Sequence, residues 1–522
     1  LTDILRFICD PIGQLTVGRS ALAGIMEESR IQPVPVGELR SVCPPLSIEP
    51  ASSEKASATS AYLGQERAIN AIRFGIQMEH DGYNVFVLGP LGSARHSLVE
   101  ELAKEPAQAK GAPDDWCYIN NFSDPERPRA LRLAAGKGAE FRDDMQALIE
   151  EIQLAIPAAF ENDDYGNQLK ALEAETQKEV DELWRSLHQQ AAEQGIGLMQ
   201  TPTGYVLAPL SDDKVINDKE FEELPEAKRK EIEQSIQRLG EELKARIEAM
   251  PKLRKRHHER VRTLDREVAA HAVSVLLEDL KQKYQGQPAV LGYLEEVQQD
   301  IIENAQAFRR TEAPTLPFLA HDPTAIFASY EVNLIVSNKS DAAAPIIYEP
   351  NPSYPNLVGK VEHRAEMGAL LTDFRLVRSG ALLQANGGYL VLDAHRELSR
   401  PYVWEALKQA LLTQQVRIES PAETLGFAST TTLTPEPIPL DLKILLVGER
   451  WLYYLLCNYD REFRGLFKVS ADFDDDVERS TSNVAAYARL IAERVQQNEL
   501  LPLSAAAVAR VIEQRARYAD DS

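Results

Sequence analysis

The 522-residue chain has few cysteines, no long apolar run and a deficit of positive charge. Its four cysteines, Cys9, Cys43, Cys117 and Cys457, lie far apart and form no CxxC pair. A structural zinc site and a disulfide framework are therefore not expected, and we predict a reducing, cytoplasmic location. No apolar run reaches the roughly 20 residues of a membrane span. The N-terminus, which starts at Leu1, has no charged-then-apolar signal pattern.

Acidic residues outnumber basic ones by 80 to 57, which gives a formal net charge of −23. This charge argues against nonspecific binding to nucleic acid or to anionic membranes. The hydrophobic and charged fractions, 44% and 26%, are typical of a soluble globular protein, and the length predicts two or three domains. Because the chain opens on Leu1 and closes abruptly on Asp520-Asp521-Ser522, we interpret it as part of a longer protein.

The most informative stretch begins with an apolar run from Tyr83 to Leu88 and ends in a helical pattern from Ser97 to Lys104. Between them lies the sequence Gly89, Pro90, Leu91, Gly92, Ser93, Ala94, Arg95, His96, Ser97. A phosphate-binding loop reads GxxxxGK[ST]: its glycines let backbone N–H groups surround phosphates, its Lys neutralises charge and its hydroxyl holds Mg²⁺. Here Ala94, Arg95 and His96 replace the second Gly, the Lys and the Ser or Thr. An ordinary strand-turn-helix corner is the alternative interpretation.

A second strand end lies far downstream, where the apolar run after Asn386-Gly387-Gly388 ends in Asp393. Nucleoside-triphosphate enzymes present a carboxylate to Mg²⁺ in this way, at the carboxyl edge of a parallel sheet. Many of them follow it with a Glu that activates water, and here that position is Ala394. The alternative is a buried strand that ends in a turn Asp.

The pattern predicts an α/β fold with a parallel sheet, interrupted by a long helical, coiled-coil-like insertion. We expect strands at 116–119, 333–336, 416–419 and 443–448, helices at 65–77 and 402–413, and a hairpin or loop at 201–209 within the insertion. The basic run from Lys252 to Arg260 fits a charged helix face or a nucleic-acid patch. The domain bounds we expect are an N-terminal segment and linker at 1–60, a core at 61–137 and 313–478, the insertion at 138–312, and the start of a helical lid at 479–522.

From about Leu63 to its end, the chain resembles the AAA+ module of Lon-like proteases, in the branch with a long helical insertion. The resemblance rests on LGQERAINAIRFG, DDWCYINNFSDPERPRALRL, GKVEHRAEMGALLTDFRLVRSGALLQANGGYLVLDA and LKILLVGERWLYYLLCNYDREFRGLFKV. It implies ATP or ADP with Mg²⁺ as cofactor, protein substrates, and assembly into a homo-hexameric ring. It also implies a C-terminal Ser-Lys peptidase domain, which this chain does not include.

The resemblance implies residue roles position by position. Gly64 and Gln65 would contact the adenine, the loop from Gly89 to Ser97 would hold the phosphates, and Asp393 would be the Mg²⁺-side carboxylate. Arg464 would be an arginine finger that reaches a neighbouring subunit, the alternative being a surface Arg. Tyr354 and Leu357 would grip substrate in the ring pore, the alternative being a packed loop.

Arg95, His96 and Ala394 depart from the family pattern, so we hypothesise weakened nucleotide binding and slow or absent hydrolysis. A non-hydrolysing AAA+ scaffold or adaptor is the second hypothesis. A third is a DNA-linked motor, because the segment from Gly359 to Asp393 also resembles that of enhancer-dependent transcription activators. The acidic charge and the lack of a DNA-binding motif disfavour it.

Overall fold

The computed structural model describes residues 34–35, 42–43, 64–90, 95–201, 204–211, 214–215, 221, 225–308, 327–366, 369–419 and 433–518. These residues fall into two compact units. The larger unit runs from Arg67 to Phe473, and the smaller one groups the described residues up to Glu66 with those from Asp474 onward. Leu91, Gly92, Ser93 and Ala94 of the expected phosphate loop lie outside the described residues.

A five-stranded parallel sheet forms the centre of the larger unit, in the order β17-β1-β16-β13-β8. The strands are β1 (Val85–Leu88), β8 (Ile346–Glu349), β13 (Tyr389–Asp393), β16 (Lys443–Gly448) and β17 (Val469–Asp472). Their near-continuous Val, Ile and Leu runs suit strands that are covered on both faces. The predicted α/β class with a parallel sheet is confirmed.

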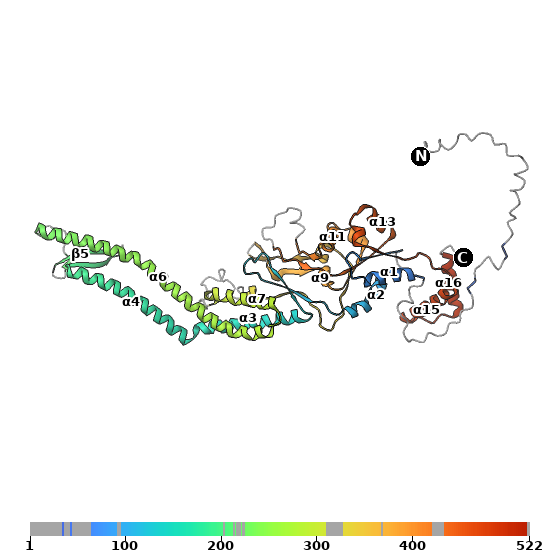
Figure 1. Ribbon diagram of the computed structural model, residues 1–522, viewed down its shortest axis with the longest axis horizontal. Helices are drawn as coiled ribbons and strands as arrows, with labels where there is room; N and C mark the ends of the chain where they lie inside the picture. The colour runs from blue at the N-terminus through green and yellow to red at the C-terminus, as the bar shows by residue number, and fades with distance from the viewer. Residues whose placement is uncertain are drawn as a thin grey trace, which may run out of the picture. The chain divides into compact units, whose positions relative to one another are not determined.

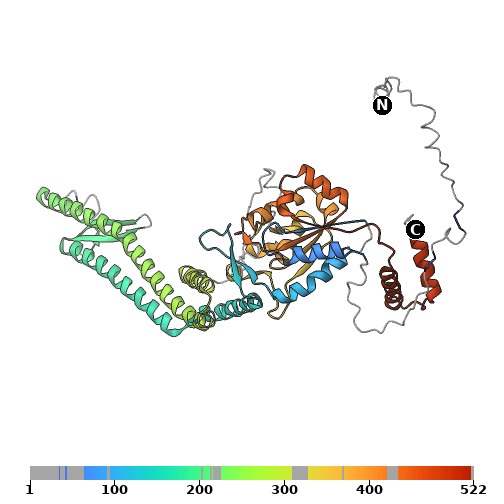
Figure 2. The ribbon, with the colours of Figure 1, turned by 45° about the vertical axis from the view of Figure 1, so that its right-hand side comes forward.

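Helices cover both faces of this sheet, with α1 and α2 on one side and α11 and α13 on the other (Figures 1 and 2). Their bounds are α1 (Glu66–Gln77), α2 (Arg95–Lys110), α11 (Val403–Thr413) and α13 (Arg450–Tyr459). The α11 and α13 side is a large core in which Phe86, Leu392 and Leu446 of the sheet pack on Trp404, Leu407 and Leu452. Alternate residues of each strand point to the opposite side, which is why one strand serves two layers.

A second, antiparallel sheet, in the order β3-β2-β7, joins this core to the helical insertion. Its strands are β2 (Asp115–Ile119), β3 (Arg129–Leu133) and β7 (Asn333–Val336). Trp116 and Tyr118 of β2 enter the core around the parallel sheet, whereas Cys117 and Ile119 enter a separate helical core. The predicted strands at 116–119 and 333–336 therefore exist but pair with each other, outside the parallel sheet.

The helical insertion is built from α3 (Lys137–Glu161), α4 (Asp163–Glu193), α6 (Glu226–Lys283) and α7 (Pro288–Glu303). Its base packs α3, α7 and the end of α6 on β2 and β3, and α4 and α6 run side by side to the strands at their far end (Figure 1). Those strands are β4 (Ile196–Thr201), β5 (Gly204–Ser211) and β6 (Lys214–Val215). Within the hairpin or loop predicted at 201–209, the described residues belong to β4 and β5 of a three-stranded sheet. This sheet packs on the helices through the stacked rings of Trp184 and Tyr205.

The smaller unit contains two helices, α15 (Thr481–Gln497) and α16 (Ala505–Tyr518). Val484 and Ala488 of α15 pack on Val508 and Ile512 of α16, and Cys43 joins this small core. The backbone N–H of Cys43 donates to the Glu513 carboxylate at 3.0 Å. A piece of the N-terminal segment is therefore held on the C-terminal helix pair.

The remaining elements are short. The helices are α8 (Tyr354–Leu357), α9 (Ala381–Gln384), α10 (Ala394–Leu398) and α14 (Phe463–Leu466); the 3₁₀ turns are η2 (Ala305–Phe308), η4 (Phe327–Tyr330) and η5 (Phe374–Leu376); the strands are β9 (Gly359–Val361), β10 (Arg364–Glu366), β11 (Ala369–Leu371), β12 (Val377–Ser379), β14 (Gln415–Val416) and β15 (Ile438–Pro439). The strand expected at 416–419 is thus only Gln415–Val416, and the helix expected at 97–104 extends over Arg95–Lys110.

Candidate functional site

The two strand ends singled out in the sequence meet at the carboxyl edge of the parallel sheet. β16 lies between β1 and β13, with Leu88 opposite Gly448 and Asp393 opposite Val447. Gly89, the first residue after β1, and the carboxylate that ends β13 therefore lie at the same edge of the sheet. Parallel α/β sheets commonly bind their ligands in the crevice outside this edge. His96, near the start of α2, brings the two strand ends into contact: its Nε2 lies 3.8 Å from Oδ2 of Asp393.

Arg95, which replaces the phosphate-loop Lys, is buried and points into the ends of the strands. Its Nη1 donates to the carbonyl oxygen of Gly448 and, at 3.5 Å, to that of Val87. Burial lowers the pKa of the guanidinium, and the nearby Asp393 carboxylate partly opposes this shift. The cation that a phosphate would need is thus already bound to two backbone carbonyls.

Gly89, the first glycine of the loop, is required by a close approach. A Cβ placed there would lie 2.7 Å from Cβ of Phe473 and 3.5 Å from Cδ of Arg95. A side chain at this position would push away Phe473 in the chain after β17, whereas the Arg95 stem would be at ordinary contact distance. Gly89 therefore lets Phe473 pack against the start of the loop.

His96 stands where the family places a hydroxyl, and its half-buried ring packs on Tyr348 with 5.2 Å between ring centroids. Its Nε2 is buried and makes no hydrogen bond within the described part of the chain. Burial lowers the pKa of His96, and the carboxylate of Asp393 partly restores it. Near neutral pH the ring is thus mainly uncharged. Ser97, the next residue, is exposed on α2.

The two carboxylate oxygens of Asp393 make different contacts. Oδ1 accepts from the backbone N–H of Arg396 at 3.0 Å and so caps α10, while Oδ2 faces His96. The next residue, Ala394, is fully buried and contributes no polar group. The position of a water-activating Glu is therefore apolar.

These residues do not fit a Mg²⁺ site. Mg²⁺ prefers oxygen ligands, and the crevice offers one capped carboxylate beside an imidazole and a bound guanidinium. Over the residues that the structure describes, no three His, Cys, Asp or Glu side chains are grouped so as to hold a metal. Among the described residues, Asp393 therefore has no second metal ligand beside it, and its metal role stays a prediction.

Glu397, on the helix that Asp393 caps, is a buried carboxyl that the sequence analysis missed. It lies one turn after Asp393 on α10, is fully buried, and neither carboxylate oxygen makes a hydrogen bond to a described residue. Burial, with a smaller effect of Glu349, raises its pKa to about 8. The only sequence signal is its place in the helical turn after the strand.

Gly64 and Gln65, the expected adenine contacts, belong to the smaller unit. The Gln65 amide donates to the backbone oxygen of Asp474 at 3.1 Å and accepts from its N–H at 2.9 Å. Gly64 has φ +69°, and a Cβ there would lie 2.8 Å from Val477. Both residues therefore contact the segment around Asp474 and Val477 within the smaller unit.

Arg464, the expected arginine finger, is exposed on α14. Phe463 before it and Phe467 after it in the sequence are buried, and their rings stack on each other. α14 directly precedes β17 and lies beside Gly82, which directly precedes the strand region of β1. Arg464 is therefore at the amino edge of the sheet, whereas Asp393 is at the carboxyl edge. Within one chain, Arg464 cannot serve the crevice.

Tyr354 and Leu357, the expected pore residues, lie on the short helix α8. Leu357 is fully buried in the core around the parallel sheet, and Tyr354 packs against the same core. The Ser353 hydroxyl caps this helix by accepting from the N–H of Asn356 at 3.3 Å. A grip on substrate by Leu357 is therefore not possible in this conformation.

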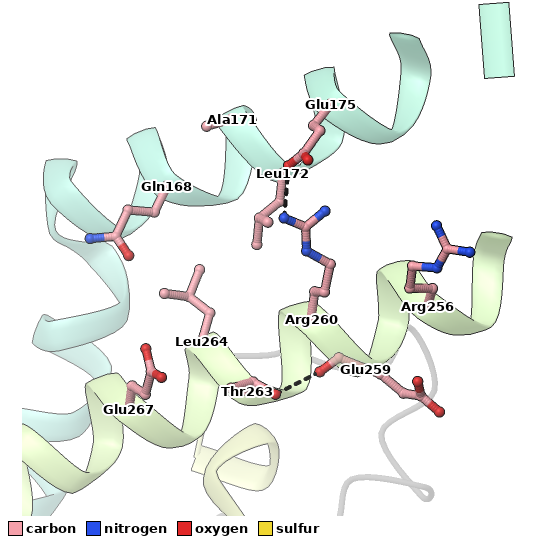
Figure 3. Close-up of a pocket in the computed structure, with 10 residues that line it drawn as sticks. All are labelled: Gln168, Ala171, Leu172, Glu175, Arg256, Glu259, Arg260, Thr263, Leu264 and Glu267. Atoms are coloured by element: carbon pink, nitrogen blue, oxygen red, sulfur yellow. Dashed lines mark hydrogen bonds and ion pairs between the residues drawn. The ribbon is translucent and has the colours of Figure 1, made fainter. Parts of the chain in front are cut away.

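A pocket also lies between α4 and α6 of the insertion, with a volume of about 510 Å³ (Figure 3). Leu172 and Leu264 point into it, and the Arg260–Glu175 ion pair, at 2.8 Å, bridges the two helices. Arg256 pairs with Glu179 at 3.4 Å. Two cations of the basic run at 252–260, Arg256 and Arg260, thus pair with acidic residues of α4. No described helix is both long and apolar enough to cross a membrane.

Comparisons with known proteins agree with this arrangement. A family model described as the LonB-like AAA domain matches residues 342–474, and one described as the Lon-like LonC helical domain matches residues 115–148. No curated protein matches. A crystal structure of NtrX from Brucella abortus matches with 18% identity over 33% of this chain and 40% of that chain, with a TM-score of 0.19, which is too low to carry an argument.

The two family matches fall on different parts of one fold. The first covers β8, β13, β16 and β17 of the parallel sheet, and the second covers β2, β3 and the start of α3. The chain therefore carries a Lon-like AAA+ module.

Proposed function

We propose that this chain is the ATPase-like, substrate-handling part of a Lon-like protease with a degenerate nucleotide site. It assembles with copies of itself into a ring, hexameric by analogy with the family, and passes protein substrates to a Ser-Lys peptidase domain outside this chain. The observation that supports the proposal is that Arg95, His96 and Asp393 lie together at the carboxyl edge of the parallel sheet. Each of the three is engaged in another interaction.

The residues that would bind a nucleotide are those of the expected site. The loop from Gly89 to Ser97 would face the phosphates, and Gly64 and Gln65 the adenine. A bound nucleotide would have to draw the Arg95 guanidinium away from the carbonyls of Gly448 and Val87, which leaves two buried acceptors unsatisfied. Each buried acceptor that loses its partner costs about 1–3 kcal/mol, so we propose weak binding of ATP or ADP.

We also propose slow hydrolysis of any nucleotide that binds, because the residues that would organise the reaction are absent. His96 supplies no hydroxyl oxygen, Asp393 spends one oxygen on the cap of α10, and Ala394 supplies no base. Loss of a general base alone typically costs a factor of 10²–10⁴ in rate. The ring would thus assemble and pass substrates to the peptidase with little or no nucleotide hydrolysis.

ATP turnover by the purified chain tests the proposal. We expect a rate far below the roughly 1–100 per second of active phosphoryl-transfer enzymes. The triple variant Arg95→Lys, His96→Thr, Ala394→Glu restores the three missing groups, and a measurable gain in turnover over the unmodified chain would identify the crevice as a decayed nucleotide site. Ordinary turnover by the unmodified chain would contradict the degenerate site.

A non-hydrolysing scaffold or adaptor is the second candidate, and the buried Ala394 favours it because it leaves no polar group for catalysis. The two candidates differ in whether the full-length protein cleaves an unfolded protein such as casein. Cleavage that is lost when a peptidase Ser is replaced supports the protease. Binding without cleavage supports the adaptor.

A further inference from the structure

The small sheet at the far end of the insertion has one unprotected edge (Figure 1). Among the described residues, its first strand, β4, pairs with β5 on one side and with no strand on the other. Its six residues, Ile196–Thr201, include no charged residue and no Pro, and they pair with β5 in one unbroken register. Proteins usually shield an edge strand by charge, Pro, a bulge or a very short length, and β4 has none of these. We call its unpaired side the β4 edge.

The opposite edge of the same sheet does carry such protection. β6, which forms it, has only two residues, and one of them is Lys214. β5, which extends past β6, contains Pro209, which has no N–H to offer to another strand. The contrast singles out the β4 edge as the side on which this sheet can be extended.

The hydrogen-bond pattern identifies the backbone groups that face outward. The N–H of Leu210 donates to the carbonyl oxygen of Gly195 at 2.7 Å, one residue before β4 begins. In an antiparallel pair, every second residue bonds to the partner strand, and the residues between them direct both backbone groups away from it. Ile196, Leu198 and Gln200 therefore present their N–H and C=O groups along the β4 edge.

The side chains of β4 hold the strand in place on one face and leave the other face open. Ile196 is buried, and Leu198 packs beside it in a small core with residues of α4 and α6. On the other face Met199 lies opposite Val206, and the two side chains are 38% and 45% exposed. A strand added at the β4 edge would thus meet a fixed backbone and, on the open face, the apolar side chain of Met199.

We infer that the β4 edge is a binding site for an extended segment of unfolded polypeptide, which adds to the sheet as a further strand. This inference rests on the proposed handling of protein substrates and names a surface of this chain that would hold them. Only an extended backbone matches a row of alternating N–H and C=O groups at strand spacing. A folded protein uses most of these groups internally, so the site would select unfolded chains. Because main-chain hydrogen bonds supply the affinity, it would accept many sequences.

Fluorescence anisotropy of a labelled, unstructured peptide with alternating apolar residues tests the inference on the 522-residue chain. Gln200→Pro removes one outward N–H and leaves the bonds between β4 and β5 in place. We expect this variant to bind the peptide at least roughly tenfold more weakly than the unmodified chain does. Gln200→Ala keeps the backbone N–H and is the matched control, which should bind like the unmodified chain. Circular dichroism verifies that both variants are folded.

A peptide that is methylated on its backbone nitrogens gives a second readout, which needs no variant of the chain. It has the same side chains but cannot donate to the outward carbonyl oxygens of β4. We expect its binding to be lost. Equal binding of the two peptides would show recognition through side chains alone and would overturn the inference.

Two lysine substitutions distinguish the edge of the sheet from its open face. Met199→Lys and Val206→Lys place the same charge on that face, but residue 199 would lie beside the added strand and residue 206 one strand further away. Met199→Lys should therefore weaken binding of the apolar peptide more than Val206→Lys does. Equal effects would point to binding across the open face and would contradict strand addition.

The remaining outcomes separate this inference from the proposed function. If Gln200→Pro binds the peptide and unfolded casein as the unmodified chain does, the β4 edge is excluded and substrate handling by another surface still stands. Self-association that is lost in Gln200→Pro, with no peptide bound, would make a second copy the occupant and would overturn the inference. An unmodified chain that binds neither the peptide nor casein contradicts the proposed substrate handling as well.

Discussion

The Nε2 of His96 lies 3.8 Å from Oδ2 of Asp393, although the two residues are almost three hundred positions apart in the chain. One starts the helix after β1, and the other ends β13. The contact exists because parallel strands bring their carboxyl ends to one edge of the sheet. It also places an imidazole where the phosphate-loop pattern has a hydroxyl.

Replacement of Asp393 by Asn tests the electrostatic part of this contact. The carboxylate raises the pKa of His96 against the effect of burial, so Asp393→Asn should lower that pKa further. Asn is as good a helix cap as Asp, so the cap on α10 should persist and stability should change by less than about 1 kcal/mol. Titration of the His96 ring by NMR measures the effect, with His96→Gln to assign the signal. An unchanged or raised His96 pKa would contradict the contact.

Glu397→Gln should stabilise the larger unit in alkaline solution. Burial raises the folded-state pKa of Glu397 from 4.5 to about 8, so the folded chain holds a proton that the unfolded chain has lost between these values. Stability therefore falls as pH rises through this window, and Gln removes the loss. We expect a gain of roughly 2–5 kcal/mol near pH 9 and little change near pH 4.

Denaturant unfolding at both pH values measures this difference. Glu405→Gln is a suitable control, because Glu405 is an exposed carboxyl on α11. An equal effect of Glu397→Gln at both pH values would show that Glu397 is not buried as an acid.

Leu357→Ala distinguishes a core residue from a pore residue. Because Leu357 is fully buried, truncation should cost about 2–5 kcal/mol of unfolding free energy. If Leu357 projected into a pore, its truncation would leave the unfolding free energy of the monomer almost unchanged and would impair only the passage of substrate. Leu370→Ala, at an exposed leucine of the same part of the chain, is the control and should stay within about 0.5 kcal/mol.

Arg464 and its neighbour Phe463 should behave in opposite ways. Arg464 is exposed, so Arg464→Ala should leave the stability of the isolated chain within about 0.5 kcal/mol. Phe463 is fully buried, so Phe463→Ala should cost about 3–5 kcal/mol. Thermal unfolding of both variants checks this. A large loss of monomer stability in Arg464→Ala would show a structural Arg and remove the case for a role in a neighbouring copy.

The sequence was sufficient for those features that depend on local pattern. The apolar run from Lys443 to Gly448 is a strand with the predicted bounds, and the helical period of the insertion gave its long helices. The meeting of the loop after Leu88 with Asp393 followed from the rule that parallel strands end together. Each of these inferences used only neighbours in sequence or a general property of sheets.

Other features depend on residues that are distant in sequence. The sequence around Arg95 does not show that its guanidinium donates to the carbonyl oxygen of Gly448. The sequence around Gly89 does not show that Phe473 packs against it. The pairing of β2 with β7 could not be predicted, because a strand pattern does not identify its partner. Leu357 and Glu397 are buried by the packing of several elements, which a linear pattern does not contain.

The central claim is that Arg95 occupies the strand ends in place of a phosphate-binding Lys, and nucleotide affinity tests it most directly. Binding of a fluorescent ATP analogue should be compared between the unmodified chain and Arg95→Lys. Lys is shorter in reach and carries a compact charge, so we predict weak binding by the unmodified chain and at least roughly tenfold tighter binding by the variant, a gain of about 1.4 kcal/mol. Tight binding by the unmodified chain that falls in Arg95→Lys would contradict the account.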